Sequence, residues 1–486
     1  MKLGKLLALV ALCAVGFGTP GNAEPSKTAK SEQANQPEVR AVWASTLAPC
    51  MNSPEEIREL VAATRRANLN TIIAQVRHRG ITYYNSSIEP RAAAIRNKPD
   101  FDPLAELLKE AHDTSGGQQR LDVYAWFNVF ALGKLDKLDI AATAPLYRNQ
   151  ADWRSRETTG SIADFMDAGL PEVQDYLISV VAECVGKYDV DGVNFDYIRY
   201  PEKEAGYHPR AIERFNKLSG RMGGQPESKD PAWAQFRRDQ VTNFVRRAAV
   251  TVWQTRPNAL VTMDAIGFGG PPQKGFSDSS PYKQVFQDWN GWLRGGWMDV
   301  ICRMGYKSEA LPKSAADFRG WADFSRKLQD ACPGQYVTVG IGGYMNTLEG
   351  TLTQYLEAQK RKLGTSLFSY NRPLKTSEET KLLGPKSPFW DELAGKVYTA
   401  QAPPVRPEWR KKFGVVAGFA LDESGHPLDG VRISLKGKGL ETKSDGSGFF
   451  AFAKLLPGKY EIAAPGSSIN KKSVEVKAGQ VVVLNK

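Results

Sequence analysis

The sequence predicts a (β/α)8 barrel followed by a small all-β sandwich. Three observations lead to this fold class. Short apolar runs alternate with longer stretches of helical periodicity from residue 38 to 399, a proline-rich stretch follows, and residues 413–486 then change to short alternating strands. The chain has 486 residues, of which 42% are hydrophobic and 24% charged, so it is long enough to bury more than one core.

The barrel prediction depends on eight β-branched, apolar runs that end in polar residues. An open doubly wound sheet is the alternative. No G-x-G-x-x-G follows the first run and no G-x-x-x-x-G-K-[ST] occurs, so dinucleotide and P-loop chemistry have no motif and the barrel is favoured. The predicted strands are Val39–Ser45, Thr71–Arg77, Asp122–Asn128, Gly192–Asp196, Leu260–Asp264, Asp299–Met304, Tyr336–Ile341 and Ser366–Tyr370.

Helical stretches separate these strands. One helix is expected over Pro54–Ala67, with Ser53 as its N-cap and acidic residues in its first turn. Two more are expected over Pro103–His112 and Pro171–Tyr188, each opening with proline.

The first 23 residues have the layout of a secretory signal peptide. Lys2 and Lys5 precede an apolar run that is shorter than the roughly 20 residues of a membrane anchor, and cleavage is expected after Ala23. Lipidation at Cys13 is a minority alternative, because bulky Leu12 precedes it. We expect an exported protein, periplasmic or extracellular, with a flexible tether at 24–37 and no integral membrane segment after signal removal.

The C-terminal part is expected to be a separate domain. Residues 400–412 are read as a proline-rich linker and 413–486 as a sandwich whose turns contain Gly, Asp and Pro. Its clearest strands are Val431–Leu435, Phe449–Ala453, Tyr460–Ala463 and Val481–Leu484.

The spacing of the cysteines and histidines does not predict a metal centre. Cys184 and Cys302 are predicted to be buried thiols, and a Cys50–Cys332 disulfide stays open. No H-E-x-x-H or C-x-x-C occurs, so we expect no metal and no cofactor. The four histidines lie far apart: His78, His112, His208 and His426.

The net charge is positive. With 64 Lys and Arg against 53 Asp and Glu, the formal charge is +11, which favours polyanionic surroundings such as an anionic cell wall. Both signs are interspersed and no long Lys/Arg run occurs, so a nucleic-acid partner is not expected. Oligomeric state is left open.

Polar residues at strand ends predict the site, because catalysis on such barrels takes place at the carboxyl ends of the strands. Strand side chains alternate, so Asn194 and Asp196 share one side while Val193 and Phe195 face the other. The same parity pairs Gln75 with Arg77, Trp126 with Asn128, and Thr262 with Asp264.

Carboxylates, amides and aromatic rings in one cleft suit a sugar, and glycoside hydrolysis needs two carboxyl groups. Asp196 and Asp264 are the predicted catalytic residues, and Glu89, Glu202 and Glu204 remain candidates for the second carboxyl. Asp264 as a purely structural residue has about equal standing. The predicted substrate-binding residues are Gln75, Arg77, Arg79, Trp126, Asn128, Asn194, Arg199, Tyr200 and Tyr306.

Several motifs occur in an order that resembles the glycosyl hydrolase-like 10 family. They are Arg40-Ala41-Val42-Trp43, Gln75-Val76-Arg77-His78-Arg79-Gly80, Phe101-Asp102-Pro103-Leu104, Ala125-Trp126-Phe127-Asn128, Pro171-Glu172-Val173, Asp191-Gly192-Val193-Asn194-Phe195-Asp196-Tyr197-Ile198-Arg199-Tyr200-Pro201 and Gln287-Asp288-Trp289.

The resemblance covers residues 38–370 and implies a barrel that hydrolyses glycosidic bonds, some members acting on peptidoglycan glycan strands. By position it assigns Asp196 as the family's acid and matches Gln75 and Arg77. The chain departs from many members at Arg303, where proline is common, and at Asn194, where histidine is common, which leaves subsite details open.

The tail resembles the carboxypeptidase regulatory-like domain through three turn-rich motifs. This resemblance implies an accessory module, for which a spacer role is at least as strong as a binding role. The motifs are Gly425-His426-Pro427-Leu428-Asp429-Gly430-Val431, Thr442-Lys443-Ser444-Asp445-Gly446 and Leu456-Pro457-Gly458-Lys459-Tyr460.

The sequence therefore predicts an exported glycoside hydrolase of an envelope or extracellular polysaccharide, with peptidoglycan glycan strands the leading candidate. A non-catalytic glycan-binding barrel is the second hypothesis, which a cavity holding Asp196 but no other carboxyl group would favour. A polysaccharide deacetylase ranks last, because it requires a His/Asp metal set.

Overall fold

The computed structural model describes residues 36–134, 144–378 and 381–484. The predicted signal peptide and residues 24–35 of the predicted tether lie outside these ranges. Within them, no helix combines the length and the apolar character that a membrane crossing requires.

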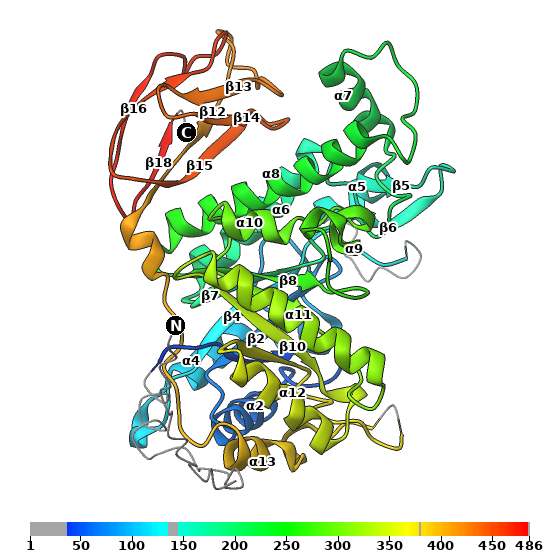
Figure 1. Cartoon of the computed structure of the whole chain (residues 1–486), viewed down its shortest axis with the longest axis vertical. Helices are drawn as coiled ribbons and strands as arrows, with labels where there is room; N and C mark the ends of the chain where they lie inside the picture. Colours follow the sequence, from blue (N-terminus) through cyan, green and yellow to red (C-terminus); the bar gives the residue numbers. More distant parts are fainter. Residues whose placement is uncertain (1–35, 135–143, 379–380, 485–486) are drawn as a thin grey trace, which may run out of the picture. The chain divides into compact units, whose positions relative to one another are not determined.

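Eight parallel strands form a closed barrel, as predicted (Figure 1). Their order around the barrel is β1-β2-β4-β7-β8-β9-β10-β11, and the β1–β2 and β1–β11 pairings close it. Each predicted strand lies within two residues of an observed one. The strands are β1 (Arg40–Ala44), β2 (Thr71–His78), β4 (Asp122–Asn128), β7 (Gly192–Asp196), β8 (Leu260–Ile266), β9 (Val300–Met304), β10 (Tyr336–Gly342) and β11 (Gly364–Phe368).

Strand alternation divides the barrel core into two parts. Val193 and Phe195 of β7 belong to the large apolar core that the helices also contribute to. Trp43, Tyr124 and Trp126 point the other way and fill the bore. Both faces of these strands are buried, which explains why their sequences read as nearly continuous apolar runs.

Helices cover the outside of the barrel (Figure 1). Side-chain caps begin several of them: Ser53 accepts from the Glu56 amide, and Asp102 and Asp230 cap their helices in the same way. The predicted helices are confirmed within one residue at their ends. The barrel helices are α2 (Pro54–Arg66), α4 (Pro103–His112), α6 (Pro171–Lys187), α8 (Pro231–Thr255), α10 (Trp289–Arg294), α11 (Pro312–Asp330), α12 (Leu348–Lys360) and α13 (Phe389–Lys396).

Short helices and strands lie in the loops at the carboxyl ends of the barrel strands. A two-residue strand follows β2, and a hairpin lies between β4 and α6. This hairpin lies in a gap between the predicted elements and is not itself predicted. These elements are β3 (Ile81–Thr82), α3 (Ala93–Arg96), α5 (Pro145–Trp153), β5 (Arg154–Arg156), β6 (Ile162–Met166), α7 (Pro209–Ser219) and α9 (Ser280–Gln284).

A β-bulge in β2 makes the orientation of Arg77 differ from the one that strict side-chain alternation predicts. Gln75 is paired with Trp126, but the next paired residue, Phe127, lies opposite Arg77, so Val76 is an extra residue. A bulge of this kind reverses the side-chain alternation beyond it. Arg77 therefore points outward with Phe127 and not into the bore beside Gln75 as expected.

All four cysteines of the described residues are free and buried. Cys184 and Cys302 are buried thiols as predicted. Cys50 lies in the barrel core, where its thiol contacts the Ser45 carbonyl at 3.5 Å, and it does not pair with Cys332. Burial raises the pKa of the Cys50 thiol to about 12.

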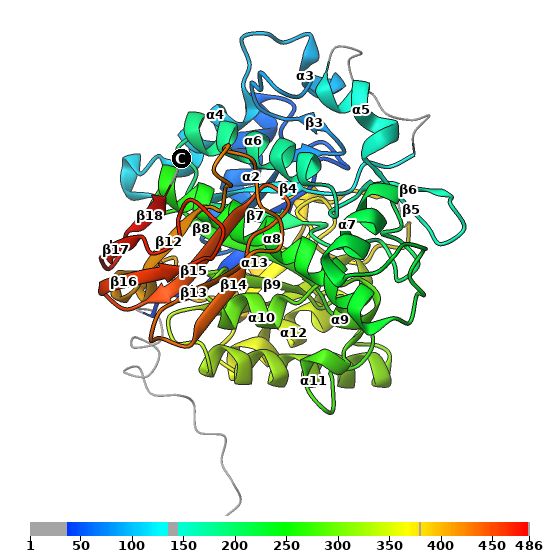
Figure 2. The same cartoon turned by 90° about the horizontal axis from the view of Figure 1, so that it is seen from above.

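The C-terminal domain is built from two antiparallel-rich sheets, as predicted (Figure 2). One has the order β15-β12-β18 and the other β14-β13-β16-β17. Their facing side chains make a separate small core that includes Ile433, Phe450 and Ile462. The strands are β12 (Gly414–Phe419), β13 (Arg432–Leu435), β14 (Leu440–Lys443), β15 (Phe449–Leu455), β16 (Gly458–Ala463), β17 (Ser473–Val476) and β18 (Val481–Leu484).

The segment predicted as a linker packs tightly against the amino ends of the barrel strands. Trp409 is buried and its indole Nε1 donates to Asp299 Oδ1 at 2.7 Å. Arg410 donates to the carbonyls of Pro257 and Ala259. The barrel core continues through Trp409 into strands β12 and β15, so residues 37–486 form one compact unit.

Candidate active site

A cavity of about 520 Å³ opens at the carboxyl ends of the barrel strands. This is the end where barrel enzymes carry out catalysis. Eight of the predicted site residues line it: Gln75, Arg79, Trp126, Asn128, Asp196, Arg199, Asp264 and Tyr306.

Asp196 is the last residue of β7 and is 5% exposed. Its Oδ1 accepts from the Tyr197 amide at 2.7 Å and lies 3.5 Å from the Arg199 guanidinium. Burial raises the pKa of Asp196 above its ordinary value, while Arg199 and the Tyr197 amide oppose the rise. Tyr197 adopts a φ of 55°, a conformation that costs a bulky residue about 1–3 kcal/mol and that clusters at functional sites.

Asp264 lies on β8, directly beside β7, and is 2% exposed. The register pairs Phe195 with Met263, so Asp196 and Asp264 occupy the next equivalent positions on adjacent strands. The indole Nε1 of Trp43 donates to Asp264 Oδ1 at 3.1 Å across the bore. The sequence does not predict this hydrogen bond, because Trp43 lies in a run with the pattern of an ordinary apolar strand.

The two carboxyl groups influence each other electrostatically. Burial, followed by the neighbouring charge of Asp196, raises the pKa of Asp264 well above its ordinary value, and the Asn194 amide and the Trp43 indole only partly offset this. Two like charges on adjacent strands in a low-dielectric bore do not both ionise readily. A site that holds one proton between two carboxyl groups can both donate and accept a proton.

An amide network fixes the floor of the cavity beside the pair. Gln75 Nε2 donates to Asn128 Oδ1 at 3.1 Å. Gln75 Oε1 accepts from the Thr46 amide and hydroxyl at 3.0 and 2.7 Å. These bonds orient both amides from the ends of three neighbouring strands, β1, β2 and β4.

Three predicted site residues do not line the cavity. Asn194 is fully buried below it, where its Oδ1 accepts from the Thr262 hydroxyl at 2.7 Å. Tyr200 is buried against Phe286 and its hydroxyl donates to Asp167 at 3.3 Å.

Arg77 is the third, and it makes a buried ion pair on the outer side of β2. Its Nε and Nη2 donate to the two Glu89 oxygens at 2.8 and 2.7 Å, and Nη1 donates to the carbonyls of Asn128 and Val129. The Tyr176 hydroxyl also donates to Glu89. Arg77 thus stabilises the ends of β2 and β4, which carry Gln75 and Asn128.

Basic side chains lie around the cavity. Arg79 is exposed and lies over Gly133, where an added Cβ would stand only 3.1 Å from the Arg79 Cδ. The Arg199 guanidinium stacks on the Tyr197 ring at 4.2 Å. Lys307 completes the basic lining. His78 also lines the cavity, but burial and the nearby Arg79 and Arg77 lower its pKa to about 4, so its imidazole is uncharged at neutral pH.

The cavity contains one carboxylate that the sequence reading missed. Asp164 lies on the β5–β6 hairpin with its side chain 49% exposed, 3.8 Å from Arg154. The loop candidates lie elsewhere: Glu89 is bound to Arg77, Glu202 lines a neighbouring hollow, and Glu204 is exposed outside the cavity lining. Other lining residues that the sequence did not single out are Ser45, Leu47, Phe165, Phe268 and Phe368.

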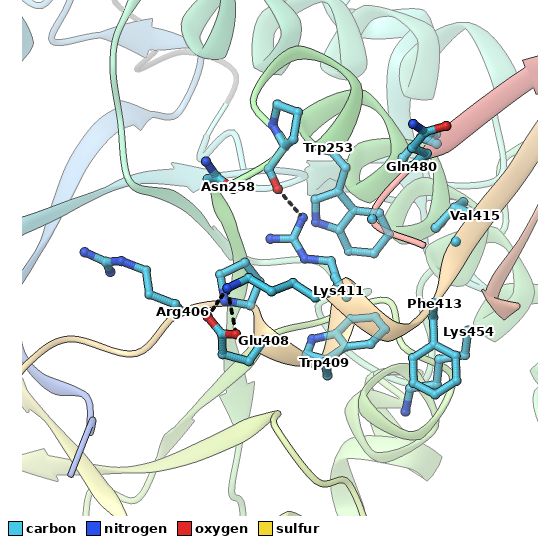
Figure 3. Close-up of a pocket in the computed structure, with 16 residues that line it drawn as sticks. Trp253, Asn258, Arg406, Glu408, Trp409, Lys411, Phe413, Val415, Lys454 and Gln480 are labelled. Carbon is cyan, nitrogen blue, oxygen red and sulfur yellow. Dashed lines mark hydrogen bonds and ion pairs between the residues drawn. The ribbon is translucent and has the colours of Figure 1, made fainter. Parts of the chain in front are cut away.

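A second hollow, of about 320 Å³, lies at the opposite end of the barrel, beside the C-terminal domain (Figure 3). Its charged groups are already engaged: Arg406 pairs with Asp122, and Lys411 pairs with Glu408. Figure 3 shows the second of these pairs. Its lining holds one carboxylate, Glu408, and so offers no pair of carboxyl groups. Among the residues that the structure describes, no group of three His, Cys, Asp or Glu is arranged to hold a metal ion.

Paired carboxyl groups in the mouth of a barrel, with amides and aromatic rings around them, are the equipment of a glycoside hydrolase. The family model of "Glycosyl hydrolase-like 10" matches residues 38–333, and the "Carboxypeptidase regulatory-like domain" model matches 415–485. The chain belongs to the glycosyl hydrolase-like 10 family.

Two relatives carry the name glycosyl hydrolase, and two solved structures share the barrel fold. The chain is 26% identical to glycosyl hydrolase DigH of Escherichia coli K12, over 63% of this chain and 73% of that protein, and 23% identical to glycosyl hydrolase YngK of Bacillus subtilis, over 74% and 75%. The fold is similar to the PgaB glycoside hydrolase domain from Bordetella bronchiseptica, with a TM-score of 0.50 and 11% identity over 69% of this chain and 94% of that one. The β-amylase catalytic domain of Paenibacillus polymyxa also has a TM-score of 0.50, with 11% identity, over 76% of this chain and 100% of that one.

Proposed function

We propose that this glycoside hydrolase is exported and cleaves the glycan strands of peptidoglycan by a two-carboxylate mechanism. The observation that carries the proposal is that Asp196 and Asp264 lie side by side on adjacent strands and line one cavity, where burial and the charge of Asp196 raise the pKa of Asp264. Under the binding-only hypothesis, the cavity would hold Asp196 without a second carboxyl group. The presence of Asp264 therefore favours hydrolysis.

The environments of the two carboxyl groups suggest their roles. Asp264 is the more buried and has the more strongly raised pKa, so it holds its proton and acts as general acid on the leaving oxygen. Asp196 has the Tyr197 amide and Arg199 beside it, which favour its ionised form, and it acts as nucleophile or base. Gln75 and Asn128, oriented by their own hydrogen bonds, position sugar hydroxyls.

The lining supports an acidic sugar as part of the substrate. Arg79, Arg199 and Lys307 surround the cavity and offer charge-assisted hydrogen bonds to a carboxylate. The aromatic rings of Trp126 and Tyr306 offer faces for the apolar side of a sugar ring. Peptidoglycan glycan without its stem peptides carries a free carboxyl group on every second sugar and fits both features, and the formal charge of +11 favours the anionic wall.

The test is product analysis by mass spectrometry after incubation with purified peptidoglycan, with and without its stem peptides. Wild-type protein is compared with Asp196→Asn and with Asp164→Asn, the matched control at the half-exposed rim. We expect glycan fragments from wild type and Asp164→Asn but none from Asp196→Asn. Intact glycan after wild-type treatment would reject the substrate, and binding to sacculi without cleavage would favour the glycan-binding alternative.

A further inference from the structure

The cavity mouth carries exposed apolar side chains on two opposite sides. Phe268, in the loop after β8, is 51% exposed, and Leu47, in the loop after β1, is 72% exposed. Both line the cavity. In the strand order, β1 and β8 are four strands apart in either direction, so these two loops face each other across the mouth.

The loop that carries Phe268 is held firmly on both sides of the ring. Gly267 packs against β9, where an added Cβ would lie 2.9 Å from the Met304 carbonyl oxygen. The Gly269 carbonyl accepts from the Trp321 indole and from the Lys307 amine, both at 3.1 Å. The exposed phenyl ring is therefore presented by a fixed backbone.

Single exposed apolar residues need no explanation, but a pair that flanks a reactive centre does. Asp196 at the end of β7 and Asp264 near the end of β8 line the same cavity as the two loops. The flat ring of Phe268 would cover the apolar face of a sugar and release bound water, which gives a favourable contribution proportional to the covered area. Leu47 would do the same on the other side.

We propose that Phe268 is a specificity-determining residue that binds a sugar unit on one side of the carboxyl pair while Leu47 contacts the chain on the other side, so that the protein binds and cuts the interior of a glycan chain. This inference rests on the proposed function and adds to it the mode of attack. Affinity and turnover then depend on chain length, because a disaccharide cannot reach both loops.

The experiment uses a ladder of peptide-free glycan oligosaccharides, from disaccharide to octasaccharide, prepared from peptidoglycan. Rates are measured for wild type, Phe268→Ala and Phe268→Trp. The control is Leu456→Ala, which removes an exposed apolar side chain of the C-terminal domain, at 63% exposure, away from the cavity.

For Phe268→Ala we expect the KM for the octasaccharide to rise about tenfold, which corresponds to about 1.4 kcal/mol of binding free energy. The KM for the disaccharide, kcat for both, and all values of Leu456→Ala should stay as in the wild type. Phe268→Trp should retain the low KM, because it keeps an aromatic face.

An octasaccharide KM unchanged in Phe268→Ala, or one raised equally for the disaccharide, would overturn the inference and leave the proposed hydrolase intact. If the wild type does not cleave the ladder, the proposed function fails, and calorimetric titration of the same ladder then decides on Phe268. Affinity that does not grow with chain length, or no binding, would overturn the inference in that case.

Discussion

At the scale of single residues, the burial of Asp264 has a cost for folding. The pKa of Asp264 is raised well above that of a carboxyl in an unfolded chain. A group with a raised pKa in the folded state contributes stability below its unfolded pKa and loses it as the pH rises through the folded pKa. The wild-type fold should therefore become less stable, relative to an uncharged variant, toward neutral pH.

Replacing Asp264 with asparagine tests this cost. Asp264→Asn keeps an oxygen for the Trp43 indole and removes the ionisation, so its melting temperature should exceed the wild-type value by a margin that grows from pH 4 to pH 8. Activity should fall about 10²- to 10⁴-fold, as for loss of a general acid. Calorimetric melting over this pH range is the measurement, Asp164→Asn is the control, and a margin that narrows with rising pH would contradict the account.

In the proposed mechanism, Trp43 is a positioning residue that acts through Asp264. Its indole favours the ionised carboxylate, so Trp43→Phe should raise the pKa of Asp264 further. Since a general acid must be protonated, the basic limb of the pH–activity profile should move to higher pH. A profile that keeps the wild-type basic limb, in a variant that melts normally, would show that Trp43 serves packing alone.

The sequence could predict the residues that follow simple alternation but not those that depend on three-dimensional detail. Asn128, Asp196 and Asp264 lie where parity places them, because their strands are regular. Arg77 does not, since the bulge at Val76 leaves no signal in an apolar run.

At the scale of elements, the bulge in β2 converts a predicted sugar ligand into a structural ion pair. Arg77 and Glu89 are 1% and 0% exposed as side chains, so each leaves an uncompensated buried group when the other is removed. The pair joins β2 to the segment that follows it and supports the Asn128 carbonyl. This role predicts a stability effect without a direct effect on substrate binding.

A double-mutant cycle on this pair distinguishes the two roles. Arg77→Met should destabilise the protein by about 3–5 kcal/mol in denaturant unfolding. Glu89→Gln should lower the free energy of unfolding by less in the Arg77→Met protein than in the wild type, because Glu89 has already lost its ion-pair partner in the Arg77→Met protein. Below the melting range, the KM of Arg77→Met should match the wild type, and a KM raised without loss of stability would restore the substrate-binding role.

Element positions were more predictable than the loops between them. The eight strands and the capped helices carry strong periodicity and N-cap signals, for example Ser53 and Asp102. The β5–β6 hairpin has strands of only three and five residues, which are too short for a periodicity that would place Asp164 at the cavity. The presentation of Phe268 likewise depends on the packing of Gly267 against another strand.

At the scale of the whole molecule, the C-terminal domain is part of the same folded unit as the barrel. Arg214 forms a bidentate pair with Asp429 at 2.9 and 3.1 Å, and Lys454 donates to Gln335 at 2.7 Å. Trp409 carries the barrel core toward β12 and β15. The proline content of residues 400–412 predicts a stiff connection. The docking of side chains such as Trp409 depends on three-dimensional packing and could not be predicted from the sequence.

Trp409→Ala tests this docking. Loss of a buried tryptophan and of its hydrogen bond to Asp299 should cost about 3–5 kcal/mol. Wild-type protein should melt in one transition by calorimetry, whereas the variant should show a destabilised or split transition. Leu456→Ala, whose side chain is exposed, should stay within about 0.5 kcal/mol of the wild type.

The decisive measurement is the rate at which new reducing ends form on peptide-free glycan strands as a function of pH. It tests whether the Asp196–Asp264 pair hydrolyses glycosidic bonds. Wild type, Asp196→Asn and Asp264→Asn are compared at temperatures where all three are folded. We expect the wild-type rate to follow a bell-shaped dependence on pH and the rate of each variant to be lower by at least about 100-fold. Wild-type rates in either variant would contradict this expectation and transfer the chemistry to another carboxyl group, with Asp164 the first to test.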